Sequence, residues 1–198
     1  MKAKIWNSKE LSIRFGMTNI NICKIDTNIY FCALLKRSNL KILQTGDLAP
    51  EFSTVNTERK KISLSEYRGK NVVLLFFPFA FTSVCTKELC MMRDDITKYS
   101  AMNAEIFAIS VDSPHALKKF KEEQNLPFQL LTDFNKNISS SYGCLYEEFH
   151  LGLKGVSKRS AFVIDKNGII RYEEILENAG EIPNFVLINQ NLESLIEQ

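Results

Sequence analysis

The sequence lacks any apolar run approaching the roughly 20 residues that a membrane-spanning helix needs, and it lacks a marked excess of one charge. Its formal net charge is only +2 at pH 7, which gives no reason to expect binding to nucleic acid or to a membrane surface. Repeats and low-complexity tracts are also missing. Hydrophobic residues make up 45% of the 198 residues, which is enough for a globular core and excludes global disorder.

Metal-binding and disulfide patterns are equally scarce. No CxxC pair is present and the two histidines, His115 and His150, stand alone, so we expect neither a zinc site nor a CxxC-type disulfide oxidoreductase, and no cofactor. An odd, scattered set of cysteines is not typical of a secreted disulfide framework, so we expect a reducing, cytoplasmic compartment. The five cysteines are Cys23, Cys32, Cys85, Cys90 and Cys144.

The N-terminal segment differs from the rest of the chain. Its first 40 residues contain seven lysines and arginines but only two acids, Glu10 and Asp26. No compact apolar stretch follows the early lysines, so a secretory signal is not indicated. An organellar presequence would explain the basic character, but the segment is rich in lysine and asparagine rather than arginine and serine. We favour an N-terminal extension over residues 1–43, or upstream sequence read from an early start codon, followed by one domain over residues 44–198.

Hydrophobic patterning beyond this segment predicts alternating strands and helices. Asn71–Phe77 is a continuous apolar, β-branched run typical of a buried central strand, and it stops at Pro78. The other predicted elements are a short hairpin around Phe52 and Val55, helices over 82–99, 113–124, 136–142 and 182–197, strands over 105–111 and 128–132, and a hairpin over 161–175 with an Asn-Gly turn. Strand-helix-strand units imply a parallel core, and the last hairpin adds antiparallel strands. We therefore expect a thioredoxin-like α/β fold, a central mixed β-sheet flanked by helices.

Cys85 is the cysteine whose surroundings suggest chemistry. It follows the buried strand, Pro78 and a short loop, and it falls in the first turn of a helix that begins near Thr82. Backbone N–H groups are unpaired there and the helix macrodipole is positive, so the nucleophilic thiolate is favoured over the thiol. The alternative is a buried cysteine that packs as a small hydrophobic residue, which is the commoner role of an arbitrary cysteine.

The spacing Pro78-x-x-x-Thr82-x-x-Cys85 resembles the active-site signature of the peroxiredoxins, the AhpC/TSA superfamily. The flanking segments GDLAPEF and KRSAFVIDKNGIIR also agree, and the similarity extends from about residue 44 to the C-terminus. The segments FFPFAFTSVCTKEL and RYEEILENAGEIP are most similar to the alkyl hydroperoxide reductase E branch, which is usually a one-cysteine type.

The resemblance implies a thiol peroxidase in which Cys85 attacks one peroxide oxygen. Thr82 would direct its hydroxyl toward the peroxide and the thiolate, Pro78 would shield the sulfur, and Arg159 would place a permanent cation beside it. Considered from the residues alone, Thr82 could be a helix N-cap, Pro78 a strand terminator and Arg159 a surface charge. Glu88 fits equally well as a group that orients an arginine and as an ordinary acid near the helix start.

Cys90 is the internal candidate for reducing the resulting sulfenic acid. The CxxxxC spacing matches the bacterioferritin comigratory protein branch and departs from the one-cysteine pattern of the flanks. Residues five apart in an intact helix have Cα atoms about 8.6 Å apart, whereas a disulfide needs roughly 4.4–6.8 Å. A Cys85–Cys90 disulfide therefore requires the first helical turns to unwind. Packing in the core is the alternative for Cys90, and Cys144 is a weaker resolving candidate.

The resemblance also implies partners. The substrates would be hydrogen peroxide and organic hydroperoxides, the reductant a thioredoxin- or glutaredoxin-like protein or another external thiol, and the assembly a homodimer. A different class of function remains open, namely a non-catalytic thiol redox sensor or holdase on the same fold.

Overall fold

The structure is a computed structural model that describes residues 43–196 of the chain. These residues belong to a compact unit that runs from Leu40 to Gln198. The N-terminal extension expected over residues 1–43 lies outside the described residues apart from Leu43, and so do Cys23 and Cys32. The domain boundary at residue 44 therefore stays a prediction.

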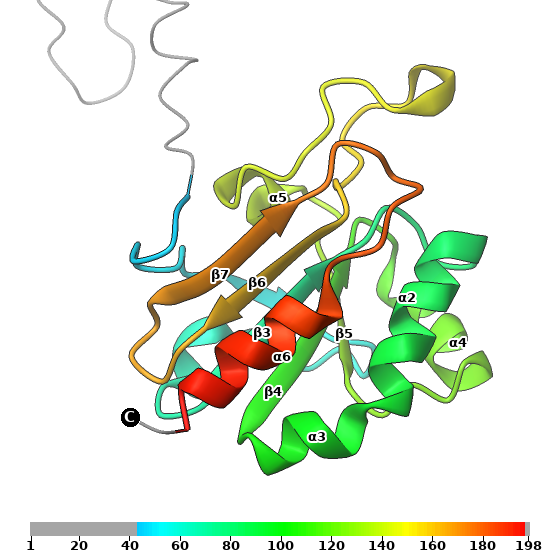
Figure 1. The fold of residues 1–198 in the computed structure, drawn as a ribbon. Helices are drawn as coiled ribbons and strands as arrows, with labels where there is room; N and C mark the ends of the chain where they lie inside the picture. The colour runs from blue at the N-terminus through cyan, green and yellow to red at the C-terminus, as the bar shows by residue number, and fades with distance from the viewer. Residues whose placement is uncertain (1–42, 197–198) are drawn as a thin grey trace, which may run out of the picture. The chain divides into compact units, whose positions relative to one another are not determined.

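A five-stranded mixed sheet forms the centre of the domain, with strand order β5-β4-β3-β6-β7 (Figure 1). The middle strand β3 (Asn71–Phe76) pairs in parallel with β4 (Ala104–Ser110) and antiparallel with β6 (Ser160–Ile164). Beyond these, β5 (Gln129–Thr132) is parallel to β4, and β7 (Ile170–Ile175) is antiparallel to β6. The predicted central mixed sheet is confirmed.

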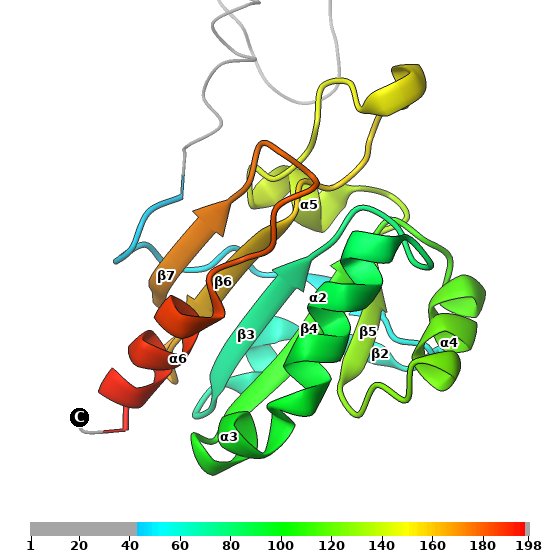
Figure 2. The same cartoon turned by 45° about the vertical axis from the view of Figure 1, so that its right-hand side comes forward.

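Helices cover one face of this sheet, and short elements cover the other (Figures 1 and 2). The helical face has α2 (Ser83–Asp94), α3 (Ile96–Ala101), α4 (Pro114–Glu123) and α6 (Phe185–Ser194). The opposite face has the hairpin of β1 (Ser53–Val55) and β2 (Lys61–Ser63), the 3₁₀ turn η1 (Leu64–Tyr67) and α5 (Asn137–Ser141). A second 3₁₀ turn, η2 (His150–Gly152), lies in the connection before β6.

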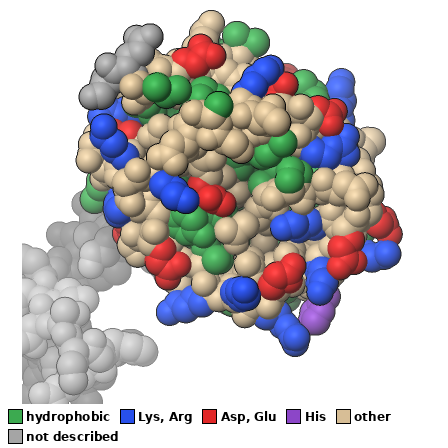
Figure 3. All heavy atoms as spheres, turned by 90° about the horizontal axis from the view of Figure 1, so that it is seen from below, with side chains coloured by type: hydrophobic (Ala, Val, Ile, Leu, Met, Phe, Trp, Pro, Cys, Tyr) green, Lys and Arg blue, Asp and Glu red, His purple; other side chains and the backbone are tan. Residues whose placement is uncertain are grey.

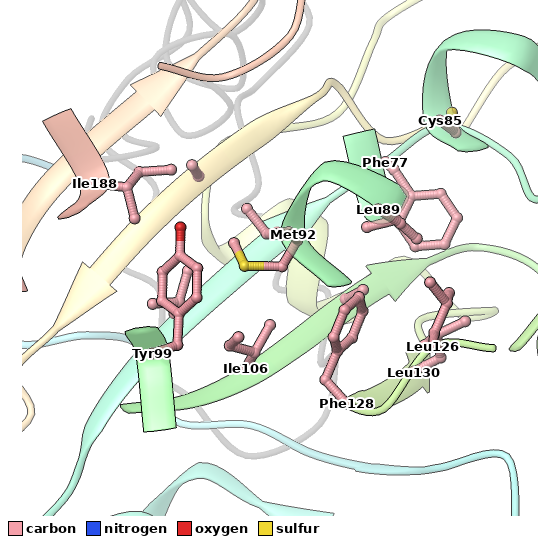
Figure 4. Packing of buried hydrophobic residues seen from close by; sticks show 14 of the residues in the cluster. Phe77, Cys85, Leu89, Met92, Tyr99, Ile106, Leu126, Phe128, Leu130 and Ile188 are labelled. Carbon is pink, nitrogen blue, oxygen red and sulfur yellow. The ribbon is translucent and has the colours of Figure 1, made fainter. Parts of the chain in front are cut away.

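The burial of β3 on both faces explains its uninterrupted apolar sequence. Val73 and Leu75 pack with the helices α2, α3, α4 and α6, whereas Val72 and Leu74 belong to the core cluster on the opposite face. Successive strand side chains point to opposite faces, so a strand covered on both sides has no polar alternation. Figure 4 shows the core cluster that packs between the sheet and these helices. Cys85, on α2, belongs to this cluster.

The single helix predicted over residues 82–99 is wrong, because the chain forms two helices there. α2 ends at Asp94, Asp95 adopts φ −99° and ψ 9°, and α3 begins at Ile96. Aspartate is a poor helix-interior residue whose side chain favours turns. Here the Asp95 carboxylate accepts a hydrogen bond from Lys98 Nζ at 2.8 Å, across the first turn of the new helix.

The surface and the helices agree with the small net charge and the absence of long apolar runs. Figure 3 shows basic and acidic side chains interspersed on the face that it displays, rather than gathered into a patch of one sign. Within residues 43–196, no helix has the length and apolar character needed to cross a membrane.

Candidate active site

The loop that joins β3 to α2 is fixed at its base and in its middle. Phe77 extends the pairing with β4 by donating its N–H to Ile109 O at 3.0 Å, and Pro78 behind it is buried. In the middle of the loop, Ala80 N–H donates to Asp112 Oδ2 at 2.8 Å. The same carboxylate oxygen accepts from the Ser110 hydroxyl at 2.6 Å. These bonds hold the loop that leads into α2.

Cys85 is the third residue of α2 and is 1% exposed. Its Sγ accepts a hydrogen bond from Arg159 Nη2 at 3.3 Å. The N–H groups of the first helical turn and the positive end of the helix dipole lie at the same place. A cysteine that packs only as a small hydrophobic residue is not expected to have a buried guanidinium hydrogen-bonded to its sulfur.

Arg159 lies immediately before β6 and is also 1% exposed, so its interpretation as a surface charge is wrong. Besides contacting Cys85, its guanidinium forms an ion pair with Glu88 through Nη1 and donates from Nη2 to Ala179 O at 3.0 Å. Glu88, one turn beyond Cys85 on α2, is completely buried. Of the two interpretations of Glu88, the geometry favours the one in which it orients the arginine.

The electrostatics of this pair are governed by burial and mutual attraction. Burial raises the pKa of the Glu88 carboxyl to about 7, although the charge and hydrogen bond of Arg159 act in the opposite direction. For Arg159, burial lowers the pKa, but the attraction of Glu88 and then of Cys85 outweighs it, so the net pKa is raised. The guanidinium therefore stays positively charged beside the sulfur.

Thr82 is the N-cap residue of α2, but its side chain does not make the capping hydrogen bond. The hydroxyl instead donates to Phe79 O at 3.1 Å, within the loop, and the Thr82 carbonyl accepts from the N–H of Thr86 at 2.9 Å. Thr82 therefore occupies the N-cap position, as one interpretation of the sequence had it, but its side chain does not cap the helix. Thr82 and Pro78 lie at opposite ends of the loop that leads into the helix of Cys85.

The buried strand, the loop, the first-turn cysteine and the buried arginine agree with a comparison to known families. The sequence pattern of the AhpC/TSA family matches residues 45–173. The chain belongs to the AhpC/TSA family. It is a peroxiredoxin, and hence a thiol peroxidase with a thioredoxin fold.

Individual relatives of this peroxiredoxin come from both predicted branches. Alkyl hydroperoxide reductase E of Mycobacterium tuberculosis is 35% identical over 144 residues, 71% of this chain and 90% of the relative. A putative peroxiredoxin bcp of Coxiella burnetii is 36% identical over 65% of this chain and 85% of its own length. Among solved structures, a peroxiredoxin-like protein from Aquifex aeolicus superposes with a TM-score of 0.70 at 27% identity, covering 77% of this chain and 88% of that one.

The second cysteine of the CxxxxC pair lies on the same uninterrupted helix as the first. Cys90 is partly exposed, and α2 is continuous from Ser83 to Asp94, so Cys85 and Cys90 are held five residues apart in an intact helix of the peroxiredoxin. Cα atoms five residues apart in an intact helix are too far apart for a disulfide. A disulfide between Cys85 and Cys90 therefore requires the start of α2 to unwind.

Cys144 has the surroundings of a packing residue. It is fully buried and belongs to the core cluster on the sheet face opposite Cys85. Burial raises the pKa of the Cys144 thiol well above its ordinary value, which disfavours the nucleophilic thiolate. The packing interpretation of Cys144 fits this environment.

Two parts of the site were not found from the sequence. The position of Asp112 could have been predicted from the sequence, because it follows a strand parallel to β3. The carboxyl ends of neighbouring parallel strands share one edge of a sheet. Ala179 could not have been predicted in this way, since it contributes a backbone carbonyl. It also lines a cleft of about 360 Å³ with Tyr146, Phe149 and other residues. Among residues 43–196, no group of three or more His, Cys, Asp or Glu could hold a metal ion.

Proposed function

We propose that Cys85 is the peroxidatic cysteine and that this peroxiredoxin reduces hydrogen peroxide and organic hydroperoxides. The observation that best supports this is the hydrogen bond from the buried Arg159 to the Cys85 sulfur. The Cys85 thiolate attacks one peroxide oxygen, the O–O bond breaks, and the other oxygen leaves as water or an alcohol after taking up a proton. The product is a sulfenic acid on Cys85.

The remaining residues would act by placing charge and excluding water. Arg159 stabilises the thiolate and the charge that develops on the leaving oxygen, and Glu88 keeps the guanidinium in place. Pro78, buried at the end of β3, shields the sulfur. The hydroxyl of Thr82 would turn from Phe79 O toward the bound peroxide.

For the second half of the cycle, we propose that Cys90 attacks the sulfenic acid and forms an internal disulfide. A thioredoxin- or glutaredoxin-like protein would then reduce it in a cytoplasmic compartment. The partial exposure of Cys90 and its place on the same helix support this assignment over Cys144. A homodimeric assembly, and a peroxidase domain that begins near residue 44, belong to the same proposal.

The decisive test of the first step is rapid mixing of the reduced protein with hydrogen peroxide. We expect a rate constant orders of magnitude above that of a free thiol, lost in Cys85→Ser and retained in the control Cys144→Ala. A rate equal to that of a free thiol would overturn the peroxidase assignment. A non-catalytic redox sensor would be oxidised without sustained turnover when a reductant is supplied.

A separate measurement tests the second step. Peroxide treatment should remove two thiols per chain without forming a covalent dimer on a non-reducing gel, and peptide mass mapping should join Cys85 to Cys90. In Cys90→Ser, the sulfenic acid should persist and become accessible to trapping reagents. Full turnover of Cys90→Ser with a thioredoxin-type donor would instead show that an external thiol resolves Cys85.

A further inference from the structure

Cys90 lies in a polar contact between α2 and the end of α4. Its Sγ donates a hydrogen bond to Gln124 Oε1 at 3.7 Å, and Gln124 is the C-cap residue of α4. The thiol is therefore held by a neutral amide at the surface, and it is not fully buried in the apolar cluster that encloses Cys85.

Arg93 lies one turn further along α2 and binds the same residue of α4. Its Nη1 donates to Gln124 O at 2.8 Å, and its Nε donates to Asp94 Oδ1 at 2.8 Å. Side chains three residues apart on a helix are neighbours, so Arg93 and Cys90 share one face. The hydrogen bond to Asp94 raises the pKa of Arg93 most, and the Coulombic interaction with Cys90 adds to it, despite some desolvation.

We propose that Arg93 is a positioning residue that prepares Cys90 for attack on the oxidised Cys85. The inference rests on the proposed roles of these two cysteines. The Cys90 thiolate attacks the sulfenic sulfur of Cys85, an S–S bond forms, the S–O bond breaks, and the departing hydroxide takes up a proton to become water. The Arg93 cation lies one turn from Cys90 and would attract the negative charge that the Cys90 sulfur carries as it attacks.

The position of this contact also fits the motion that the disulfide requires. Unwinding of the first turns of α2 would release Cys85, whereas the contacts of Cys90 and Arg93 with Gln124 lie beyond those turns. Cys90 can thus stay against α4 while Cys85 approaches it. The Arg93 side chain is 32% exposed, and its bond to the Gln124 carbonyl would keep the guanidinium beside the waiting thiol.

The test separates the two chemical steps in Arg93→Met after mixing with one equivalent of hydrogen peroxide. Sulfenic acid formation on Cys85 should proceed at the parent rate, and disulfide formation should slow roughly 3- to 10-fold, because the attacking sulfur then lacks a nearby cation. Arg93→Lys should restore most of the rate. Lys70→Met, which removes a positive charge from an exposed position just before β3, at the other end of that strand from the loop to α2, should change neither step.

A second variant keeps the arginine and changes the charge opposite the thiol. Gln124→Glu retains the backbone carbonyl that Arg93 binds but places a carboxylate beside Cys90, so disulfide formation should again slow. Parent rates of disulfide formation in Arg93→Met or Gln124→Glu would overturn the inference and leave the role of Cys90 intact. Equal slowing in Arg93→Met and Arg93→Lys would show a structural role only, and the absence of any Cys85 sulfenic acid in the parent would overturn the proposed function itself.

Discussion

Arg159 and Glu88 form a buried ion pair whose hydrogen bonding is incomplete. Among the described residues, Arg159 Nε and Glu88 Oε1 are buried atoms without a hydrogen-bond partner. Buried ion pairs rarely stabilise a fold more than apolar side chains of the same size would, because both charges lose their hydration. The pair therefore makes more sense as a device that holds a cation against Cys85 than as a contribution to stability.

The Glu88 carboxyl gives this pair a measurable pH dependence. Its pKa is raised from the ordinary 4.5 to about 7, so the folded protein holds a proton there that the unfolded chain has lost. The contribution of the protonated Glu88 to the free energy of unfolding is therefore fully present below pH 4.5. It is lost as the pH rises through about 7. We expect this group to lower the free energy of unfolding by at most about 3 kcal/mol over that interval.

Urea denaturation of the reduced protein at a series of pH values measures this effect against Glu88→Gln, which does not titrate. The parent should lose stability relative to the variant as the pH rises from 5 to 8. Parallel pH profiles for the two proteins would show that Glu88 is ionised throughout, held in that state by Arg159.

At this scale the sequence identified the participants but not their surroundings. Arg159 follows Lys158, and such a pair usually faces solvent, so only the family resemblance distinguished it. Its burial depends on the entry to β6 lying beside the start of α2, and these segments are 74 residues apart in the chain. No local pattern encodes that proximity.

The first turns of α2 meet two opposing requirements. An intact helix places Cys85 beside Arg159 for the proposed attack on peroxide, whereas the proposed Cys85–Cys90 disulfide requires the same turns to unwind. The stability of these turns should therefore set the rate of the second step. Lys87 lies between the two cysteines at an exposed position, where a substitution changes helix propensity without disturbing the core.

Lys87→Gly should accelerate disulfide formation relative to Lys87→Ala. Glycine costs a helix about 1 kcal/mol relative to alanine, which corresponds to roughly a fivefold rise in the unwound population. Quenched-flow thiol mapping after oxidation measures the rate, and thermal denaturation should show the matching loss of stability. Equal rates in the two variants would mean that unwinding does not limit this step.

Hydrophobic spacing predicted the position of α2 but not its end. Apolar residues at helical spacing located α2 correctly, but the same spacing continued through Ile96 and concealed the turn at Asp95. A one-residue break changes the hydrophobic periodicity very little. The predicted hairpin of β6 and β7 agrees with the structure because the turn residue Gly168 adopts φ +84°, a conformation that glycine accepts readily.

At the scale of the described domain, the central sheet separates Cys85 from Cys144, which lie on its opposite faces. Cys85 lies in the cluster under the helices, and Cys144 lies in the cluster under β1, β2 and α5. The sheet between them is a closed layer of buried strands, and side-chain motion alone cannot bring the two sulfurs together.

Cys144→Ala should therefore leave both peroxide reaction and Cys85–Cys90 disulfide formation unchanged. Its effect should be confined to stability, with a loss of about 1 kcal/mol for a small cavity in the core. Peptide mapping of the oxidised variant and a denaturation curve measure the two outcomes. A disulfide joining Cys85 to Cys144 in the parent protein would contradict this arrangement of the faces.

The sequence alone determined that the domain has an α/β fold with a mixed β-sheet, because continuous apolar strands, amphipathic helices and an Asn-Gly turn are local patterns. It also placed Cys85 in the first turn of a helix. Only the tertiary structure decided that Arg159 is buried against that sulfur, that Glu88 holds the arginine, and that Gln124 joins Arg93 to Cys90. These contacts join residues distant in sequence or turns of different elements, and their geometry is fixed by how the helices pack on the sheet.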